Sequence, residues 1–452
     1  SGLQTITWRG NTDIKRFINI SPIIKVKMVN IIPFRGLRYN STTIELSEVV
    51  APPYDVISED EQFKYHEKKE FNVIRLILGR ERPEDTSQNN KYTRAAAYLD
   101  DWLEQGVLIR DGEPSIYAYE EEYRYRNEKR VMRGFIALAG LEELGNGSIL
   151  PHEETLREPV KDRLALIRTC KANFSSIFTV YSDPSGAVEN ALNVENTGKL
   201  VTDVVADGVR HRLWRVSDPR AIEGVVDGMM DKQVMIADGH HRYETALNFW
   251  RKTRDEKHGY VMMYFTNMDL AGITILPAHR VVRDLKNLSL EGLKAKLGRY
   301  FSIAEFTAAN GSASRRQLLK QMRQLNRTKH VLGLYCEGRY FLLSLIDEKI
   351  LDEIGNQGKS REWRRLDVSI VHSLVLTHIL GVEADGDDVV YVTNAGEAVE
   401  MVGKGLYQLV VFVNHTKLTE VKNIATRGER MPGKATYFYP KLLTGLVMNK
   451  MD

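Results

Sequence analysis

Cysteine is scarce in this sequence, and charge of either sign is not in excess. The 452 residues include two cysteines, Cys170 and Cys336, which lie far apart with no C-x-x-C spacing. This excludes a disulfide scaffold or a cysteine zinc knuckle and is typical of a reducing compartment, so we expect a cytoplasmic protein. The net charge of +3 comes from 63 basic and 60 acidic residues. Such a balance does not concentrate nucleic acid, and small-molecule partners are expected instead.

Long apolar runs are also missing. The best of them, "LYQLVVFVN" at 406–414, is far shorter than the ~20 residues of a membrane span and has the composition of a buried strand. The first 27 residues lack the apolar core of a secretory signal. We interpret 1–27 as an N-terminal extension or a tag-derived segment, with Met28 as the natural start, and expect no membrane association.

From Met28 the pattern predicts a mixed α/β (α+β) protein. Residues 90–108 have the spacing of a helix, and the runs 115–125 and 130–144 predict paired strands around a polar turn. We assign no element to the stretch that ends near residue 225. Because single cores stop growing near ~250 to 300 residues, we expect a core at 28–285 with an inserted β-rich segment, and a C-terminal α/β region at 286–452 that contributes to the site.

Hydrogen-bond donors are concentrated in "DGHHR" at 238–242. The preceding "QVMIA" predicts a buried strand, and Tyr243, Ala246, Leu247 and Trp250 fall on one face of a helix that follows. The motif is therefore predicted to be a strand-loop-helix junction. Gly239 permits a left-handed backbone there, and the unpaired amides at the helix start face the loop.

Such a junction favours an anion. His240, His241 and Arg242 add donors, and arginine grips phosphate oxygens bidentately, whereas Asp238 could hold Mg²⁺ or orient a histidine. The alternative is that Asp238 only caps the helix and the histidines lie at the surface. That alternative explains the aspartate and leaves the three further donors unexplained.

Two other loops carry charges that suit phosphoryl transfer, in which cations bind the transferring group and a carboxylate takes the hydroxyl proton. "LPHEETLREPVKDRL" supplies charged and imidazole groups, and "VVAPPYDVIS" offers a carboxylate and a phenol after two prolines. The candidates are His152, Glu153, Lys161 and Arg163 in the first loop and Tyr54 and Asp55 in the second. The alternatives are a solvated charged face and a structural turn capped by Asp55.

The segment "GERMPGKA" at 428–435 has the G-x-x-x-x-G-K skeleton of a P-loop, but Ala435 stands where Ser or Thr should bind Mg²⁺. It follows a helix-like segment instead of a buried strand, so we reject a P-loop. The surrounding polar residues, Glu429, Lys434, Thr436 and Lys441, are still candidates for substrate binding, with a solvated turn as the alternative. His279 stands at the end of another predicted strand and is a candidate for a phosphate contact. The alternative is a histidine that is held only by a hydrogen bond.

Two rival chemistries lack their motifs. Catalytic zinc would favour H-E-x-x-H, in which two histidines share one helix face, and "HHRYE" and "PHEET" do not have that spacing. Nucleophilic hydrolysis would favour a G-x-S-x-G elbow, which is absent.

The loop "ADGHHRYETA" resembles the signature loop of the ParB/sulfiredoxin fold, in which a Gly-x-His-Arg turn before a helix binds nucleotide phosphates. Seven motifs in order look like the family catalogued as domain of unknown function 1015: "IIPFRGLRYN", "VVAPPYDVIS", "LPHEETL", "KDRL", "ADGHHRYETAL", "ILPAHRVV" and "GERMPGKATYFYPK". Enzymes that resemble this fold include free serine kinases. Sulfiredoxin chemistry needs a cysteine in this loop, where the chain has His240.

The resemblance implies a ParB/sulfiredoxin-like phosphate-binding core and a kinase that converts free L-serine to O-phosphoserine with Mg²⁺. The phosphoryl donor, pyrophosphate, ADP or ATP, stays open. The expected roles are catalytic for Asp238, His240, Glu153 and Asp55, with Asp238 also the metal ligand; phosphate-binding for Gly239, His241, Arg242, Lys434 and Arg163; and substrate-binding for Tyr54, His152, Lys161, His279, Glu429, Thr436 and Lys441. The alternative is a non-catalytic nucleotide-binding or DNA-linked regulator, although no helix-turn-helix with a basic recognition helix is evident.

Overall fold

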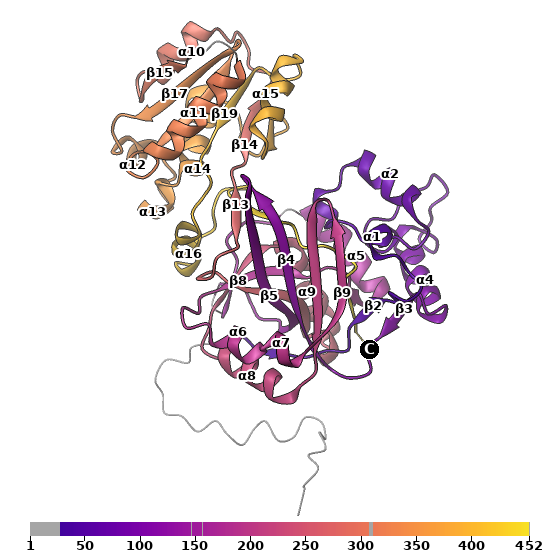
Figure 1. Cartoon of the computed structure of the whole chain (residues 1–452). Coiled ribbons are helices and arrows are strands. Elements are labelled where there is room, and N and C mark those ends of the chain that lie inside the picture. The colour runs from indigo at the N-terminus through magenta and orange to yellow at the C-terminus, as the bar shows by residue number, and fades with distance from the viewer. Residues whose placement is uncertain (1–27, 146, 156, 307–310, 452) are drawn as a thin grey trace, which may run out of the picture.

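Two separate sheets organise the chain, and each forms the centre of one lobe (Figure 1). The computed structural model describes residues 28–145, 147–155, 157–306 and 311–451, so the extension expected at 1–27 lies outside the described residues. Helices and strands are mixed in both lobes, as the sequence predicts. Within the described ranges, no helix has the length and apolar character needed to cross a membrane.

The sheet of the first lobe has nine strands in the order β6-β11-β8-β12-β5-β4-β10-β9, with β1 also paired to β5. Its strands are β1 (Ile31–Ile32), β4 (Ile116–Tyr125), β5 (Glu128–Gly140), β6 (Ile149–Leu150), β8 (Ile177–Tyr181), β9 (Gly198–Ala206), β10 (Val209–Val216), β11 (Val234–Asp238) and β12 (Tyr260–Asn267). The predicted β4–β5 hairpin is confirmed, with Tyr125 opposite Glu128 across its turn.

A second hairpin, β9–β10, occupies the stretch to which the sequence analysis assigned no element. Its turn is Asp207-Gly208, and both residues have positive φ, 49° and 77°. Asp-Gly is a strong signal for this kind of two-residue turn. Along β10, Val209, His211 and Leu213 alternate toward the core, which is the period of a half-buried strand.

Helices pack on this sheet and beside it. The principal ones are α5 (Arg157–Cys170), α6 (Ala187–Leu192), α8 (Pro219–Met229) and α9 (His240–Thr253). Tyr243, Ala246 and Leu247 of α9 enter the same core cluster as Ile177 of β8 and Phe265 of β12. The burial confirms the helical spacing in the sequence and fixes the start of α9 at the end of β11.

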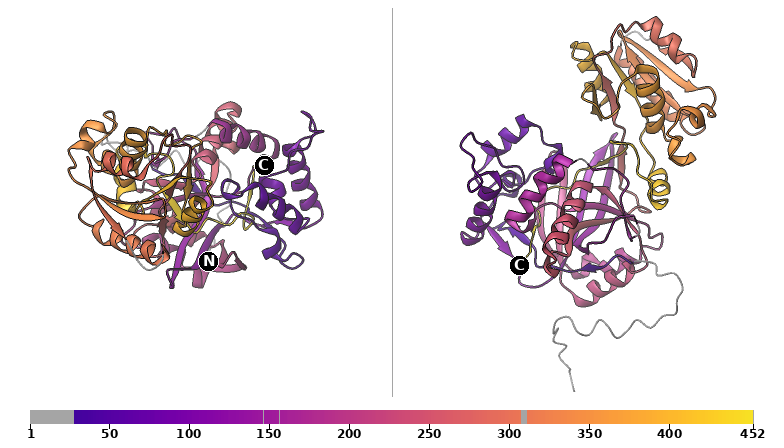
Figure 2. Two further views of the ribbon diagram at one scale, coloured as in Figure 1. Left: turned by 90° about the horizontal axis from the view of Figure 1, so that it is seen from above. Right: turned by 180° about the vertical axis from the view of Figure 1, so that it is seen from behind.

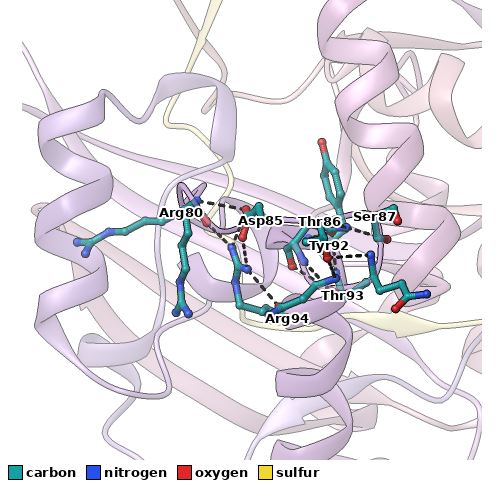
Figure 3. A network of polar contacts seen from close by, with 11 residues as sticks. Arg80, Asp85, Thr86, Ser87, Tyr92, Thr93 and Arg94 are labelled. Atoms are coloured by element: carbon teal, nitrogen blue, oxygen red, sulfur yellow. Dashed lines mark hydrogen bonds and ion pairs between the residues drawn. The ribbon is translucent and has the colours of Figure 1, made fainter.

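The first helices form a separate group beside the sheet, with β2 (Leu37–Tyr39) and β3 (Leu108–Arg110) (Figure 1). They are α1 (Leu46–Val49), η2 (Tyr54–Val56), α2 (Glu59–Lys68), α3 (Ile74–Ile77) and α4 (Lys91–Glu104). The side chain of Asn90 caps α4. Figure 3 shows Arg94 reaching back to the carboxylate of Asp85 and the carbonyl of Arg80. Backbone groups of the long loop before α4 are thereby satisfied.

The second lobe contains a six-stranded sheet in the order β15-β17-β16-β19-β14-β18. The strands are β14 (His279–Val282), β15 (Phe301–Phe306), β16 (Val331–Cys336), β17 (Arg339–Leu345), β18 (Val389–Val392) and β19 (Leu409–Phe412). Its helices include α10 (Leu290–Leu297), α11 (Gly311–Leu325) and α15 (Ala395–Gly403). Helix α14 (Asp367–Ile370) is continued by a π-helix, η4 (Val371–Leu380).

The chain crosses between the lobes twice. It leaves the first lobe after β13 (Thr274–Leu276) and returns after β19 through α16 (Leu418–Thr426). The returning strand β20 (Tyr437–Tyr439) pairs with β13, and β21 (Asn449–Lys450) pairs with β7 (Ala172–Asn173). Figure 2 shows this last segment, in yellow, running back into the first lobe.

Candidate functional site

The junction of β11 and α9 is the strand-loop-helix geometry that the sequence predicts. Gly239 joins the two elements at a φ of +97°, and it provides no side-chain cap for α9. A Cβ at this position would lie 2.9 Å from guanidinium atoms of Arg242. Glycine is therefore required both for the left-handed backbone and for the close approach of the arginine.

Asp238, the last residue of β11, binds two cations. Its Oδ1 accepts a hydrogen bond from Nζ of Lys441 at 2.7 Å, and its Oδ2 accepts one from Nη2 of Arg242 at 2.8 Å. Burial alone would raise the pKa of Asp238, but these cations outweigh it and hold the pKa well below its usual range. The carboxylate is therefore ionised and fixed between two cations at the start of α9, and its oxygens do not cap the helix.

Arg242 and Lys441 are held from further sides as well. Arg242 donates through Nη1 to the carbonyl of Ser176 at 2.5 Å, while its buried Nε has no partner among the described residues. Lys441 lies over the ring of Tyr437, 4.4 Å from its centroid. Neither Ser176 nor Tyr437 is among the candidates expected from the sequence. Tyr437 lies inside the motif already marked, whereas Ser176 carries no sequence signal.

A chain of hydrogen bonds connects two buried histidines next to this ion cluster. His152 donates through Nδ1 to the carbonyl of Ile236 at 2.6 Å, so its Nε2 accepts from the hydroxyl of Thr436 at 2.9 Å. The backbone N–H of His152 donates to Nε2 of His240 at 3.2 Å. Burial lowers the pKa of His152 to about 4, and burial together with the neighbouring His152 holds the pKa of His240 well below its usual value. Both rings are therefore neutral, with the proton of His240 on Nδ1.

Glu153 faces the same cluster. Its Oε2 lies 4.0 Å from Nδ1 of His240, and its Oε1 accepts from the backbone N–H of Lys434 at 2.6 Å. Burial raises the pKa of Glu153 against the opposing effect of Lys434. Lys434 itself has a positive φ of 55° and an exposed side chain, so the loop at 431–436 brings a cation to the rim of the site.

Asp55 joins the cluster from the N-terminal part of the chain. Burial lowers the pKa of Lys441, but Asp238 and Asp55 outweigh it and raise the pKa overall. Burial also lowers the pKa of His241, and the carboxylates of Asp55 and Glu153 oppose this effect. Asp55 therefore lies near both Lys441 and His241, at the exposed side of the site.

Other residues singled out from the sequence lie outside this cluster. Tyr54 stacks on the guanidinium of Arg163, at 4.0 Å, and burial raises its pKa to about 12. Arg163 is buried and binds Asp162 and the carbonyl of Ile77. Both line a cavity that Arg242 also lines, and no contact of either with Asp238 is present among the described residues.

Three candidates lie elsewhere. Lys161 is exposed and pairs with Glu158 at 2.6 Å. Glu429 accepts from the backbone N–H of Ser360 at 2.7 Å, which fixes a turn of the second lobe. His279 is buried in β14 of the second lobe, where it accepts from the backbone N–H of Val413.

The described residues contain no group of three or more His, Cys, Asp or Glu side chains placed to hold a metal ion. Both oxygens of Asp238, the expected metal ligand, already accept from cations. Mg²⁺ is commonly held by one or two carboxylates together with substrate phosphates and water. This pattern fits the separate carboxylates of Glu153 and Asp55, and a complete protein cage is not present in the part of the chain that the structure describes.

Comparison with known proteins identifies a family. Residues 31–369 match the family described as "Protein of unknown function (DUF1015)". No curated protein matches the chain significantly.

Three solved structures illustrate the similarity. A point mutant of a free serine kinase in complex with AMP has 11% identity and a TM-score of 0.33, over 64% of this chain and 84% of that one. A conserved hypothetical protein from Pyrococcus furiosus has 14% identity and a TM-score of 0.34, over 67% and 92%. SbnI from Staphylococcus aureus, with a C-terminal truncation, has 12% identity and a TM-score of 0.32, over 68% and 85%.

Proposed function

Because the chain belongs to the DUF1015 family, whose function is unknown, we propose an activity from its site: transfer of a phosphoryl group to the hydroxyl of a small molecule. The expected acceptor is free L-serine, on the resemblance of its motifs to free serine kinases. In the same proposal, residues 28–285 form a ParB/sulfiredoxin-like core, 286–452 complete the site, and the protein works in the cytoplasm without nucleic acid.

One observation carries the proposal: Asp238 is held by Lys441 and Arg242 at the start of α9. The amides of a helix N-terminus face incoming anions, and a phosphate there would meet both cations. Phosphoryl transfer depends mainly on positioning and on cations that stabilise the charge of the transferring group. In this arrangement Asp238 positions the cations, and Lys434 adds a third cation from the rim.

Glu153 is the proposed general base. The acceptor oxygen attacks the terminal phosphorus while its proton moves to the Glu153 carboxylate, and the bond between phosphorus and the departing phosphate oxygen breaks. Lys441 and Arg242 neutralise the charge that develops on the departing group. Burial raises the pKa of Glu153, which makes its carboxylate a stronger base than that of an exposed glutamate.

Nδ1 of the neutral His240 imidazole lies 4.0 Å from Oε2 of Glu153, too far for a hydrogen bond, and the backbone N–H of Lys434 holds the carboxylate instead. Mg²⁺, when bound with the donor phosphates, would neutralise part of their charge. Asp55 is the carboxylate that could approach such an ion, because Glu153 is the proposed base and both oxygens of Asp238, the ligand expected from the sequence, already accept from cations.

Phosphorus NMR tests the proposal directly. Purified protein is incubated with Mg²⁺, with serine, threonine or glycerol, and with ATP, ADP or pyrophosphate. We expect a new phosphomonoester from serine with at least one donor. The product should be lost in Arg242→Ala and kept in the matched control Lys161→Ala, whose ammonium pairs with Glu158 away from the site. No phosphomonoester from any combination contradicts the proposal.

A further inference from the structure

A second cavity, of about 460 Å³, lies where the two lobes meet, and neither Asp238, Arg242 nor Lys441 lines it. The tip of the β4–β5 hairpin forms one wall, and α11 of the second lobe forms another. Residues of both crossing segments, Pro277 and Asn414 among them, complete the lining. The cavity therefore touches each lobe and both segments that join them.

The mouth of this cavity is strongly basic. Arg124 and Arg126 come from the hairpin, Arg323 comes from α11, and no aspartate or glutamate lines the cavity. Among the described residues, no ion pair joins Arg124, Arg126 or Arg323 to a carboxylate. Burial lowers the pKa of Arg323, and the guanidinium of Arg126 lowers it further. Three positive charges therefore lie together at the cavity, and no carboxylate of the described residues pairs with them.

The buried part of the lining adds a neutral donor. His279 has 2% of its surface exposed, and its Nδ1 accepts from the backbone N–H of Val413 at 3.3 Å. Burial, aided by the adjacent Arg280, lowers the pKa of His279 to about 3, so the ring is neutral and carries its proton on Nε2.

We propose that this cavity is a separate binding site for a small phosphorylated compound that contacts both lobes. Guanidinium groups match phosphate oxygens in bidentate geometry, and three of them suit a phosphate monoester or a diphosphate better than a single carboxylate. The volume falls within the range of small-molecule sites. The site does not depend on the proposed activity, because its residues are distinct from those around Asp238.

The cavity is connected to the β11–α9 junction through β20. Tyr439 lines the cavity, and Tyr437 of the same three-residue strand lies under the ammonium of Lys441. A bound phosphate compound would hold the hairpin tip, α11 and β20 in one arrangement. Occupancy at the lobe boundary would thereby act on the residues that position Asp238, which is the role of a regulatory ligand.

Calorimetry with inorganic pyrophosphate as the probe tests this site on the full chain. We expect two binding events in the unmodified protein. The double variant Arg126→Ala/Arg323→Ala should weaken one of them by roughly 100-fold, about 10-fold for each guanidinium lost, and leave the other. Both side chains are exposed, so folding should persist, which circular dichroism checks.

A matched control removes two positive charges from α11 outside the cavity, as Arg316→Ala/Lys320→Ala, and should keep both events. Arg242→Ala should remove only the event at the β11–α9 junction. If the Arg126→Ala/Arg323→Ala variant loses one pyrophosphate-binding event and the control variant does not, the result supports this site. That conclusion holds even if pyrophosphate does not bind at the β11–α9 junction. The proposal is overturned if pyrophosphate does not bind, or if binding is equal in that variant and in the control.

Discussion

At the scale of the residue, Gly239 tests how closely the backbone and Arg242 are coupled. Gly239→Ala adds backbone strain at positive φ, of about 1 to 2 kcal/mol. The new Cβ would also lie 2.9 Å from the guanidinium of Arg242 and would displace that group. Gly106→Ala is the matched control, because Gly106 also has positive φ, +71°, with nothing within 4 Å of a Cβ. Both variants should lose similar stability in urea denaturation, but only Gly239→Ala should lose phosphate affinity. Equal affinity in the two would make Arg242 independent of this glycine.

Lys441 permits a prediction about stability. Lys441→Met leaves the mostly buried Asp238 with one cation fewer, at a cost of about 3 kcal/mol near pH 7. The pKa of Asp238 is lower in the folded protein than in the unfolded chain, where it is about 4. The ion pair therefore stabilises the fold fully above about pH 4, and this stabilisation is lost as the pH falls toward the pKa of the folded state. The raised pKa of Lys441 preserves the pair up to its unfolded pKa of about 10.4.

Urea denaturation should therefore show a larger difference between the wild type and Lys441→Met at pH 7 than at pH 3. Lys450→Met serves as the control, since Lys450 pairs with the exposed Asp100 and should cost less than about 1 kcal/mol. A pH-independent difference would mean that the cost of Lys441→Met reflects packing and not the ion pair.

Glu153 gives a kinetic prediction. A general base must be ionised, so kcat/KM should fall as the pH drops through the pKa of Glu153, which is raised above the ordinary value of 4.5. Glu153→Gln should reduce kcat by roughly 100-fold or more and remove this acid limb. Glu154→Gln, at the exposed neighbour that pairs with Arg430, should keep both the rate and the limb. An unchanged limb in Glu153→Gln would assign it to another group.

At the scale of the element, the sequence predicts most of what is local. Periodicity identifies β11, α9 and the β4–β5 hairpin, because each reports the side of its own element that is buried. It does not report partners that lie far apart in the chain. Lys441 and Asp238 are 203 residues apart, and both motifs are visible in the sequence, yet only the fold of the returning segment brings them together.

The same limit explains which candidates lie elsewhere. Lys161 and Arg163 share a charged segment with Glu153, but they belong to α5, whose direction takes them toward Glu158, Asp162 and the core. The β9–β10 hairpin could have been found, since Asp207-Gly208 is a recognised turn pair between alternating residues.

The cap of α4 carries a prediction about stability alone. The side chain of Asn90 accepts from the backbone N–H groups of Tyr92 and Thr93, and it donates to the carbonyl of Thr86. Asn90→Ala should cost about 1 kcal/mol in urea denaturation. Because α4 is not part of the ion cluster around Asp238, the proposed phosphoryl transfer at 25 °C should not change. A loss of activity without a loss of stability would connect this loop to the site.

At the scale of the whole molecule, the first lobe is discontinuous in sequence. Residues 413–451 supply β20, β21 and Lys441, and they bury Phe438, Val447 and Met448 in the first lobe. A fragment of residues 28–412 should therefore fail to fold cooperatively in thermal denaturation. A fragment of 279–412 contains the whole second sheet and should fold alone. A cooperative transition of 28–412 equal to that of the full chain would contradict the structural role of the return segment.

The double crossing also sets an order in time. During synthesis, β13 of the first lobe leaves the ribosome about 170 residues before β21, a delay on the order of 10 to 30 s at typical elongation rates. The second lobe, contiguous in sequence, is complete before the first one can close. Until then the sheet strands that await β20 and β21 have unpaired edges, and these are exposed to other nascent chains. Slow translation of residues 413–451 would therefore prolong the period in which this protein is most vulnerable to aggregation.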